Sequence, residues 1–295
     1  MYSEAKNMID LELLEELVVF QKYGTLSATA EHLMITQPSV TRGMKRLEQE
    51  LGVELFNRQV NRITLNETGE LAASEAKKLL QAENDFTEKI LNFSKMQNYI
   101  NIGSVAPGPL LLTEAKKDDF KEKLTFNHQL VSQNHVLSDL RTYKERLIFT
   151  AEEFDEEDIE SMYLGTEELA VRIDKMNPLA QKKSVTFKDL AGLSFLVVQD
   201  IGPWVQVIED HIPEVQFLYQ KDLPALDELT HYSNFPVFRT NLTLATGYKE
   251  RDDDNRILVP IKDEDNYIEL YGTYLKNQRS VIQPFLKELA KNWPK

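Results

Sequence analysis

The stretch TQPSVTRGMKRLEQELGVELFNRQVNRITL, residues 36–65, decides the fold of the N-terminal part of this chain. It predicts a helix that begins after Thr36, because a threonine hydroxyl suits an N-cap and Pro38 is tolerated in a first turn. Gly52 predicts where this helix ends. Its apolar residues recur at helical spacing on one face, which must be buried. These residues are Val40, Met44, Leu47 and Leu51.

The opposite face of this helix is basic and rich in hydroxyl groups. Arginine pairs with guanine, glutamine with adenine, and serine or threonine with phosphates or base edges. For the helix taken alone, an ordinary solvated face is the alternative. The segment from Arg58 to Leu65 predicts a two-stranded wing with Asn61 at its tip. The residues that we expect to contact DNA are Thr36, Gln37, Pro38, Ser39, Thr41, Arg42, Lys45, Arg46, Arg58 and Arg62.

Two further helices precede this one. Residues 10–23 carry apolar side chains at helical spacing, and Gly24 ends the pattern. A short helix capped by Ser27 then ends at Leu33, with two residues between it and Thr36. Two helices joined by so tight a turn form a helix-turn-helix, whose second helix enters the major groove of DNA.

Together these elements resemble the N-terminal domain of the LysR-type transcriptional regulators. The resemblance is strong over residues 9–69 and weak over the rest of the chain. Thr29 departs from the pattern, because the family usually has a second alanine there. The positions that match the family's signature in register are Ala30, Leu33, Thr36, Gln37, Pro38, Ser39, Val40, Thr41, Arg42, Met44, Leu47, Glu48, Leu51, Gly52, Leu55, Phe56, Arg58 and Arg62.

The resemblance implies the organisation of the whole chain, which is of the α/β class. It implies a winged helix-turn-helix, then a long linker helix, then a two-lobed effector domain like a periplasmic binding protein. The chain would cross between the lobes near Gly165 and near Asp265. The implied ranges are 9–66 for the DNA-binding domain, 67–96 for the linker helix and 97–295 for the effector-binding domain, with lobe I at 97–165 and 266–295 and lobe II at 166–265.

The charge of the chain constrains how it can bind DNA. Its 34 Lys and Arg residues face 48 Asp and Glu residues, which gives a net charge of -14. Such acidity repels DNA except at a focused patch. Residues 36–62 form such a patch, because they carry five basic and three acidic side chains. We therefore expect useful affinity only when two heads act together in a dimer.

Other features of the sequence exclude several classes of protein. The absence of cysteine excludes disulfides, thiolate metal sites and thiol-based redox sensing. No apolar run is long enough to span a membrane and no signal peptide is recognisable, so we expect a cytoplasmic protein without a membrane partner. No catalytic motif, metal site or cofactor site is expected, and residues 252–255 predict a solvated turn rather than a calcium loop. Residues 1–7 are expected to form a short disordered extension.

Residues 67–95 predict one long helix with a heptad seam. A helix this exposed needs a partner, and in the resembled family the linker helix pairs antiparallel with its twin to make a dimer. The alternative is that the helix packs on its own C-terminal domain. Glu83 within the seam departs from an apolar pattern. The residues expected to form the dimer are Ala72, Ala76, Leu79, Phe86, Ile90 and Phe93.

The C-terminal part alternates strands and helices, which predicts largely parallel sheets. A ligand cleft in such a fold lies at the carboxyl ends of the strands. The Ser104 hydroxyl could bind an effector there, and the amides of Val105 and Ala106 could hold a carboxylate. The alternative is that Ser104 and Gln199 only satisfy loop backbone. The residues expected to contact an effector are Ser104, Val105, Ala106, Gln199, Asp200 and Ile201.

Two segments depart from the resembled family and keep the effector unidentified. Residues 143–146 read YKER where the family has Gly-x-x-Asp, and residues 231–234 read HYSN where it has Ala-Gly-Leu-Gly. The function predicted is a sequence-specific transcriptional regulator that binds operator DNA and responds to a small-molecule effector. Its further partners would be a second copy of itself and RNA polymerase. The alternative is an enzyme or small-molecule-binding protein with an accessory DNA-binding head.

Overall fold

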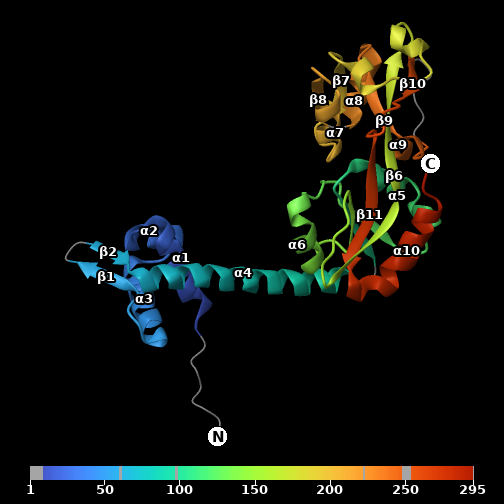
Figure 1. Ribbon diagram of the computed structural model, residues 1–295. Coiled ribbons are helices and arrows are strands. Elements are labelled where there is room, and N and C mark those ends of the chain that lie inside the picture. The colour runs from blue at the N-terminus through green and yellow to red at the C-terminus, as the bar shows by residue number, and fades with distance from the viewer. Residues whose placement is uncertain (1–8, 60–61, 97–98, 222, 248–253, 295) are drawn as a thin grey trace. The chain divides into compact units, whose positions relative to one another are not determined.

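The computed structural model describes residues 9–59, 62–96, 99–221, 223–247 and 254–294. The predicted N-terminal extension, the predicted wing tip at Asn61, and Asp252 and Asp253 of the acidic run therefore lie outside the described residues. The chain forms two compact units, Met1–Ile90 and Leu91–Lys295. Helix α4 (Glu67–Lys95) begins in the first unit and ends in the second (Figure 1).

Three helices and a two-stranded wing build the first unit, which we call the head. The helices are α1 (Leu11–Tyr23), α2 (Leu26–His32) and α3 (Gln37–Leu51), and the wing strands are β1 (Phe56–Gln59) and β2 (Arg62–Leu65). Helix α2 begins earlier than predicted, because Thr25 rather than Ser27 caps it. The Thr25 hydroxyl accepts a hydrogen bond from the amide of Ala28 at 3.1 Å.

The predicted ends of α3 are confirmed. The Thr36 hydroxyl accepts from the amide of Ser39 at 3.3 Å, and Gly52 ends the helix with a left-handed φ of 70°. Most of the predicted apolar face is buried, but the prediction for Leu51 is wrong, since this side chain is exposed. The last turn of the helix extends beyond the core of the head.

The core of the head is continuous from α1 to the start of α4. Thr29, the departure from the family pattern, is fully buried, and its hydroxyl donates to the carbonyl of Thr25. The polar group is therefore satisfied within its own helix. The two wing strands pair antiparallel, with Phe56 opposite Leu65. The buried apolar residues are Leu13, Leu14, Leu17, Phe20, Ala30, Val40, Met44, Leu47, Leu55, Phe56, Ala73 and Ala76.

One mixed sheet organises the second unit. Its strands lie in the order β4-β3-β5-β11-β6-β9-β7-β8, and β10 also pairs with β6. The prediction of largely parallel pairing is wrong in part, because β6, β10 and β11 pair antiparallel. The strands are β3 (Ile100–Ser104), β4 (Leu124–Phe126), β5 (Leu147–Thr150), β6 (Ile159–Asp174), β7 (Ser194–Val198), β8 (Gln216–Gln220), β9 (Val237–Thr240), β10 (Arg256–Pro260) and β11 (Tyr267–Leu275).

Strands β6 and β11 run through both halves of this unit (Figure 1). The chain leaves the first half along β6, which contains Gly165, and returns along β11. The register between the two strands shifts at Leu270 and Tyr271. The strand predicted at residues 169–173 is therefore the end of a much longer one.

Helices pack against each half of the sheet. One half, which we call lobe I, contains β3, β4 and β5 with α5 (Pro107–Ala115), α6 (Val136–Arg141) and α10 (Arg279–Lys291). The other half, lobe II, contains β7 to β10 with α7 (Trp204–His211), α8 (Leu223–Tyr232) and α9 (Asn241–Leu244). Among the described residues, no helix is long and apolar enough to cross a membrane.

Candidate DNA-binding surface and interlobe site

The first turn of α3 presents hydrogen-bonding groups to solvent. Thr36 and Gln37 are exposed, and Ser39 is half-buried. The hydroxyl of Ser27 donates to Oε1 of Gln37 at 3.1 Å, which leaves the amide nitrogen of Gln37 available as a donor. Ser27 was not among the predicted DNA contacts, although it helps to orient one. The open start of the helix can bind a phosphate or the edge of a base.

The five predicted basic residues fall into two groups. Arg46 pairs with Glu50 at 2.8 Å and lies 3.6 Å from Asp10, while Arg58 pairs with Glu48 at 2.6 Å. Arg42, Lys45 and Arg62 are exposed, and none of them has a carboxylate partner in the part of the chain that the structure describes. Positive charge available to a phosphate backbone is therefore concentrated on these three side chains.

Glu48 joins the recognition helix to the wing. One of its carboxylate oxygens accepts from the amides of Leu55 and Phe56, at 2.9 and 3.3 Å. The other oxygen pairs with Arg58. In the sequence, Glu48 is one of three acidic residues in a basic segment and matches the family's signature, but neither observation shows what it contacts. In the structure it fixes the first wing strand and positions Arg58 beside α3.

Asn66 fastens the wing to the start of α4. Its side-chain amide donates to the carbonyl of Glu54, and its oxygen accepts from the amide of Gly69 at 2.8 Å. A Cβ at Gly69 would lie 2.2 Å from the carbonyl oxygen of Leu55, so only glycine allows this approach. The wing is therefore fixed at both ends, by Glu48 and by Asn66.

The predicted seam along α4 divides into a buried and an exposed part. Ala76 is buried in the head's own core and Ala72 packs against it, so these two do not lie on the exposed part. Leu79, Phe86 and Ile90 are exposed, with Phe86 at 67%. The exposed apolar residues fall one or two helical turns apart on one face of the helix, which is the arrangement that a second helix covers.

The last turn of α4 belongs to the second unit and packs within it. Phe93 makes an edge contact with Tyr143, with 5.1 Å between ring centroids, and Asn92 donates to the carbonyl of Thr142. Tyr143 stands where the resembled family has glycine, and it has a left-handed φ of 54°. The hydroxyl of Tyr143 accepts from Asn277. The departure from the family pattern is thus a strained tyrosine that holds the end of the linker helix.

In lobe I, the predicted effector-binding turn uses its own polar groups. Ser104 is fully buried, and its hydroxyl donates to the carbonyl and accepts from the amide of Ala106. The amide of Val105 donates to the carbonyl of Phe149 at 2.9 Å. The predicted carboxylate cradle is wrong for this conformation, because both amides that would form it are already occupied.

The predicted segment of lobe II lies directly against this turn. A Cβ at Gly202, whose φ is 59°, would lie 2.1 Å from the carbonyl oxygen of Val105. Gln199 and Asp200 are exposed, and Asp200 accepts from the amide of Gly202 within its own loop. Ile201 packs against the large core cluster. The structure brings the two predicted segments together, with their backbones in contact rather than separated by a cleft.

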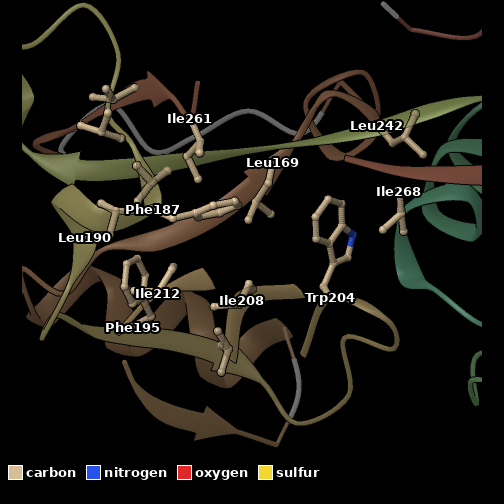
Figure 2. Packing of buried hydrophobic residues seen from close by; sticks show 14 of the residues in the cluster. Leu169, Phe187, Leu190, Phe195, Trp204, Ile208, Ile212, Leu242, Ile261 and Ile268 are labelled. Atoms are coloured by element: carbon tan, nitrogen blue, oxygen red, sulfur yellow. The ribbon is translucent and has the colours of Figure 1, made fainter. Parts of the chain in front are cut away.

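Trp204 and Glu167 lie where the two lobes meet. Trp204 is almost fully buried near Leu169 and Ile208 (Figure 2). The same cluster contains Ala106 and Leu112 of lobe I. Glu167 lies on β6 and is 1% exposed. Among the described residues, neither Oε2 of Glu167 nor the indole nitrogen of Trp204 has a hydrogen-bond partner. Burial raises the pKa of Glu167 to about 7, and the nearby Thr240 hydroxyl and Trp204 indole oppose part of that shift.

The sequence held a signal for Glu167 that the prediction missed. Alternate residues of a strand share one face, so Glu167 falls on the same face as Leu169, Val171 and Ile173. All three of these apolar side chains are buried. A glutamate in such a pattern predicts a carboxylate that points into the protein.

The second segment that departs from the family pattern, residues 231–234, is held by Arg256. This buried guanidinium donates to the carbonyls of Thr230, Ser233 and Phe235, which belong to the end of α8 and the following turn. It also pairs with Asp254, as does Arg172. The segment at residues 231–234 is therefore fixed by a side chain from β10 rather than by glycine turns. Among the described residues, no group of three or more His, Asp or Glu could hold a metal ion.

Comparisons with known proteins agree with the geometry of the head. Residues 11–70 match the family described as bacterial regulatory helix-turn-helix protein, lysR family. The HTH-type transcriptional regulator YybE of Bacillus subtilis (strain 168), itself called uncharacterized, is 29% identical over 196 residues, which are 65% of this chain and 67% of the relative. DgcR, an HTH-type transcriptional regulator of Pseudoalteromonas sp, is 26% identical over 64% of this chain and 68% of its own length.

The fold of the whole chain is also similar to a solved structure. Full-length OxyR from Pseudomonas aeruginosa, in a variant form, aligns with a TM-score of 0.53 over 97% of this chain and 96% of that chain, at 17% sequence identity. This likeness concerns the fold, and it supports the α/β class with an N-terminal helix-turn-helix.

The head and its exposed helix start define a winged helix-turn-helix DNA-binding protein. The head belongs to the lysR family of bacterial regulatory helix-turn-helix proteins, and the relatives that match about two thirds of the chain are HTH-type transcriptional regulators. Since the members of this family are regulators, the alternative of an enzyme with an accessory DNA-binding head is set aside.

Proposed function

We propose that this protein controls transcription in the cytoplasm by binding an operator through the outward face of α3 and the wing. The exposed basic residues Arg42, Lys45 and Arg62, which lack carboxylate partners in the described part of the chain, carry the proposal. The fixed wing supports it, because Glu48 and Asn66 hold the strands beside the recognition helix. Phosphate contacts would position the head, and Gln37 and Arg42 would read base edges.

The proposed dimer forms through the exposed part of the α4 seam. Leu79, Phe86 and Ile90 would pair with the same residues of a second copy, while Ala72 and Ala76 would support the seam from the head's own core. A dimer places two recognition helices on half-sites about one DNA turn, or a multiple of it, apart. This arrangement compensates for the weak, local positive charge of each head.

The proposed regulatory unit comprises residues 97–295, with the DNA-binding domain at 9–66 and the linker helix at 67–96. A small-molecule effector would act at the junction of the lobes, and it shifts their arrangement only by its differential affinity for the two states. In the conformation described, the Val105–Gly202 contact would have to open first. RNA polymerase is the proposed further partner of the DNA-bound dimer.

A selection experiment tests the DNA-binding proposal. Full-length protein would be incubated with a library of random duplexes, and bound duplexes would be recovered and sequenced. We expect enrichment of two related half-sites at a spacing close to one helical turn or a multiple of it. Recovery of unenriched, random sequence would contradict the proposal.

A pair of variants tests the dimer. Phe86→Glu places a charge in the exposed seam and should lower the mass in sedimentation from dimer, or a higher oligomer, to monomer. Binding to the selected duplex should then fall by on the order of 100-fold, because the second head no longer adds to the first. Leu71→Glu, an exposed apolar position on the same helix outside the seam, is the control. An unchanged mass for Phe86→Glu would count against the seam.

A further inference from the structure

The start of α5 is an unusual helix N-terminus because it offers few free amides. Its N-cap Ala106 already donates to Ser104, and Pro107 and Pro109 have no amide hydrogen. Among the first three residues of α5, Gly108 alone carries an amide hydrogen, because Pro107 and Pro109 stand on either side of it. Helix N-termini normally favour anions because several amides converge on them. This one cannot hold a carboxylate or a phosphate in that way.

A carboxylate of the protein itself already lies against this turn. A Cβ at Gly108 would be 2.0 Å from Oε1 of Glu167, so the glutamate packs directly on the glycine backbone. Its other oxygen, Oε2, is buried and has no hydrogen-bond partner among the described residues. An anionic ligand would meet both a shortage of donors and a like charge.

Among the described residues, the carboxylate of Glu167 has no cationic partner. In the part of the chain that the structure describes, no lysine, arginine or histidine forms an ion pair with Glu167. The neighbouring polar groups are the hydroxyl of Thr240 and the indole of Trp204. A buried carboxylate without a cation is costly, whereas a buried carboxylate paired with one is stabilised. An indole ring also attracts a cation to its face.

We infer that the ligand of this interlobe site is a small organic cation, a protonated amine or a guanidinium, whose charge pairs with Glu167 beside Trp204. The inference rests on the proposed function, because it names the chemical class of the effector. The cation would enter when the loop at Gly202 separates from Val105. It would supply the charge that the protein itself does not place there, and it would hold the lobes in the arrangement that accommodates it.

The test uses matched pairs of small compounds with the full-length protein. Butane-1,4-diamine and propylguanidine would be compared with butanedioate and butanoate at pH 8, at equal ionic strength, by calorimetry and by the shift in Tm. We expect the two cations to bind and the two carboxylates not to bind. Glu167→Gln should weaken cation binding by at least about tenfold, and Glu168→Gln, an exposed neighbour on the same strand, should leave it unchanged.

The outcomes separate this inference from the proposed function. Binding of carboxylates but not cations, equal cation affinity in Glu167→Gln, or the absence of cation binding would each overturn the inference. Folding of Glu167→Gln would be confirmed by its cooperative unfolding curve. The affinity of the wild-type protein for the selected duplex is measured in the same series. If cation binding fails while DNA binding is intact, the inference is wrong but the proposed regulatory function still holds. Failure of DNA binding itself would instead remove the proposed function.

Discussion

Helices α3 and α5 each have a glycine that contacts a glutamate side chain, and the two glutamates differ in their exposure to solvent. In each, a glutamate carboxylate from another element packs on a helix glycine: Glu16 on Gly43 in the head, and Glu167 on Gly108 in the second unit. A Cβ at the glycine would lie 2.1 Å from Glu16 in the first case and 2.0 Å from Glu167 in the second. Burial raises the pKa of both carboxyls to about 7.

The two settings differ in what the carboxylate can do. Glu16 lies on α1 and is half-buried. Glu167 lies on β6 and is almost fully buried. The start of α3 exposes Thr36 and Gln37 to solvent, whereas the start of α5 is covered by the carboxylate of Glu167. Glu16 packs on the middle of α3 and leaves the start of that helix uncovered, whereas Glu167 packs on the first turn of α5.

The largest effect expected from this comparison is on the pH dependence of stability. Because the pKa of Glu167 in the folded state is raised from 4.5 to about 7, its stabilising contribution is complete below about pH 4.5 and is lost as the pH rises through 7. Glu167→Gln should remove this loss and stabilise the protein at pH 8 by about 3 kcal/mol. Urea unfolding of both proteins at pH 5 and pH 8 measures the difference. An equal pH dependence in both would contradict the buried, unpaired state of Glu167.

A somewhat smaller effect is expected from Gly108→Ala. The new methyl group would overlap the carboxylate of Glu167, which is buried. We expect a destabilisation of about 2 kcal/mol, measured by thermal unfolding. Combining it with Glu167→Ala should restore most of the loss. If Gly108→Ala is as stable as wild type, the packing of Glu167 on this turn is not as described.

The equivalent change in the head should have little effect. In Gly43→Ala the methyl group meets only the end of the flexible Glu16 side chain. The gain in helix propensity, up to about 1 kcal/mol, should offset the displacement of that side chain. We expect a change within about 0.5 kcal/mol in the stability of the protein. A loss as large as that of Gly108→Ala would show that exposure does not separate the two sites.

The smallest effect concerns Glu16 itself. Its raised pKa also makes the head less stable as the pH rises from about 4.5 through 7. Glu16→Gln should therefore reduce that fall, but less than Glu167→Gln does in the second unit, because Glu16 reaches solvent. Amide hydrogen exchange on α1 and α3 at pH 5 and pH 8 would measure it separately from the second unit. If the exchange protection of α1 and α3 falls with pH as steeply in the variant as in wild type, the raised pKa of Glu16 does not affect the stability of the head.

The sequence predicted the head well because its signals are local. The cap at Thr36, the buried Val40, Met44 and Leu47, and the end at Gly52 all follow from spacing within one helix. The choice between Thr25 and Ser27 as the cap of α2 could not be made this way, because both hydroxyls precede the same apolar pattern. The pairing of Arg46 and Arg58 with carboxylates also depends on which elements meet in three dimensions.

The ligand site was predicted less well because it depends on contacts between distant segments. The occupied amides of Val105 and Ala106 follow from Phe149 and from the turn's own serine. The approach of Gly202 to Val105 joins residues about a hundred positions apart, which no periodicity reveals. Glu167 is the exception, since the alternation along β6 placed it on a buried face, and a search for polar residues in apolar strand patterns would have found it.

The measurement that tests the account most directly compares arginines with and without carboxylate partners on the recognition surface. Wild type, Arg42→Ala, Arg62→Ala and Arg46→Ala would be titrated with the selected duplex by fluorescence anisotropy at several salt concentrations. We expect Arg42→Ala and Arg62→Ala to lose about tenfold or more in affinity, and Arg62→Ala to reduce the salt slope by about one. Arg46→Ala, whose guanidinium already pairs with Glu50 and Asp10, should stay within about twofold of wild type. An equal loss in all three variants, or no loss in any, would contradict the proposal that the exposed, unpaired basic residues of α3 and the wing hold DNA.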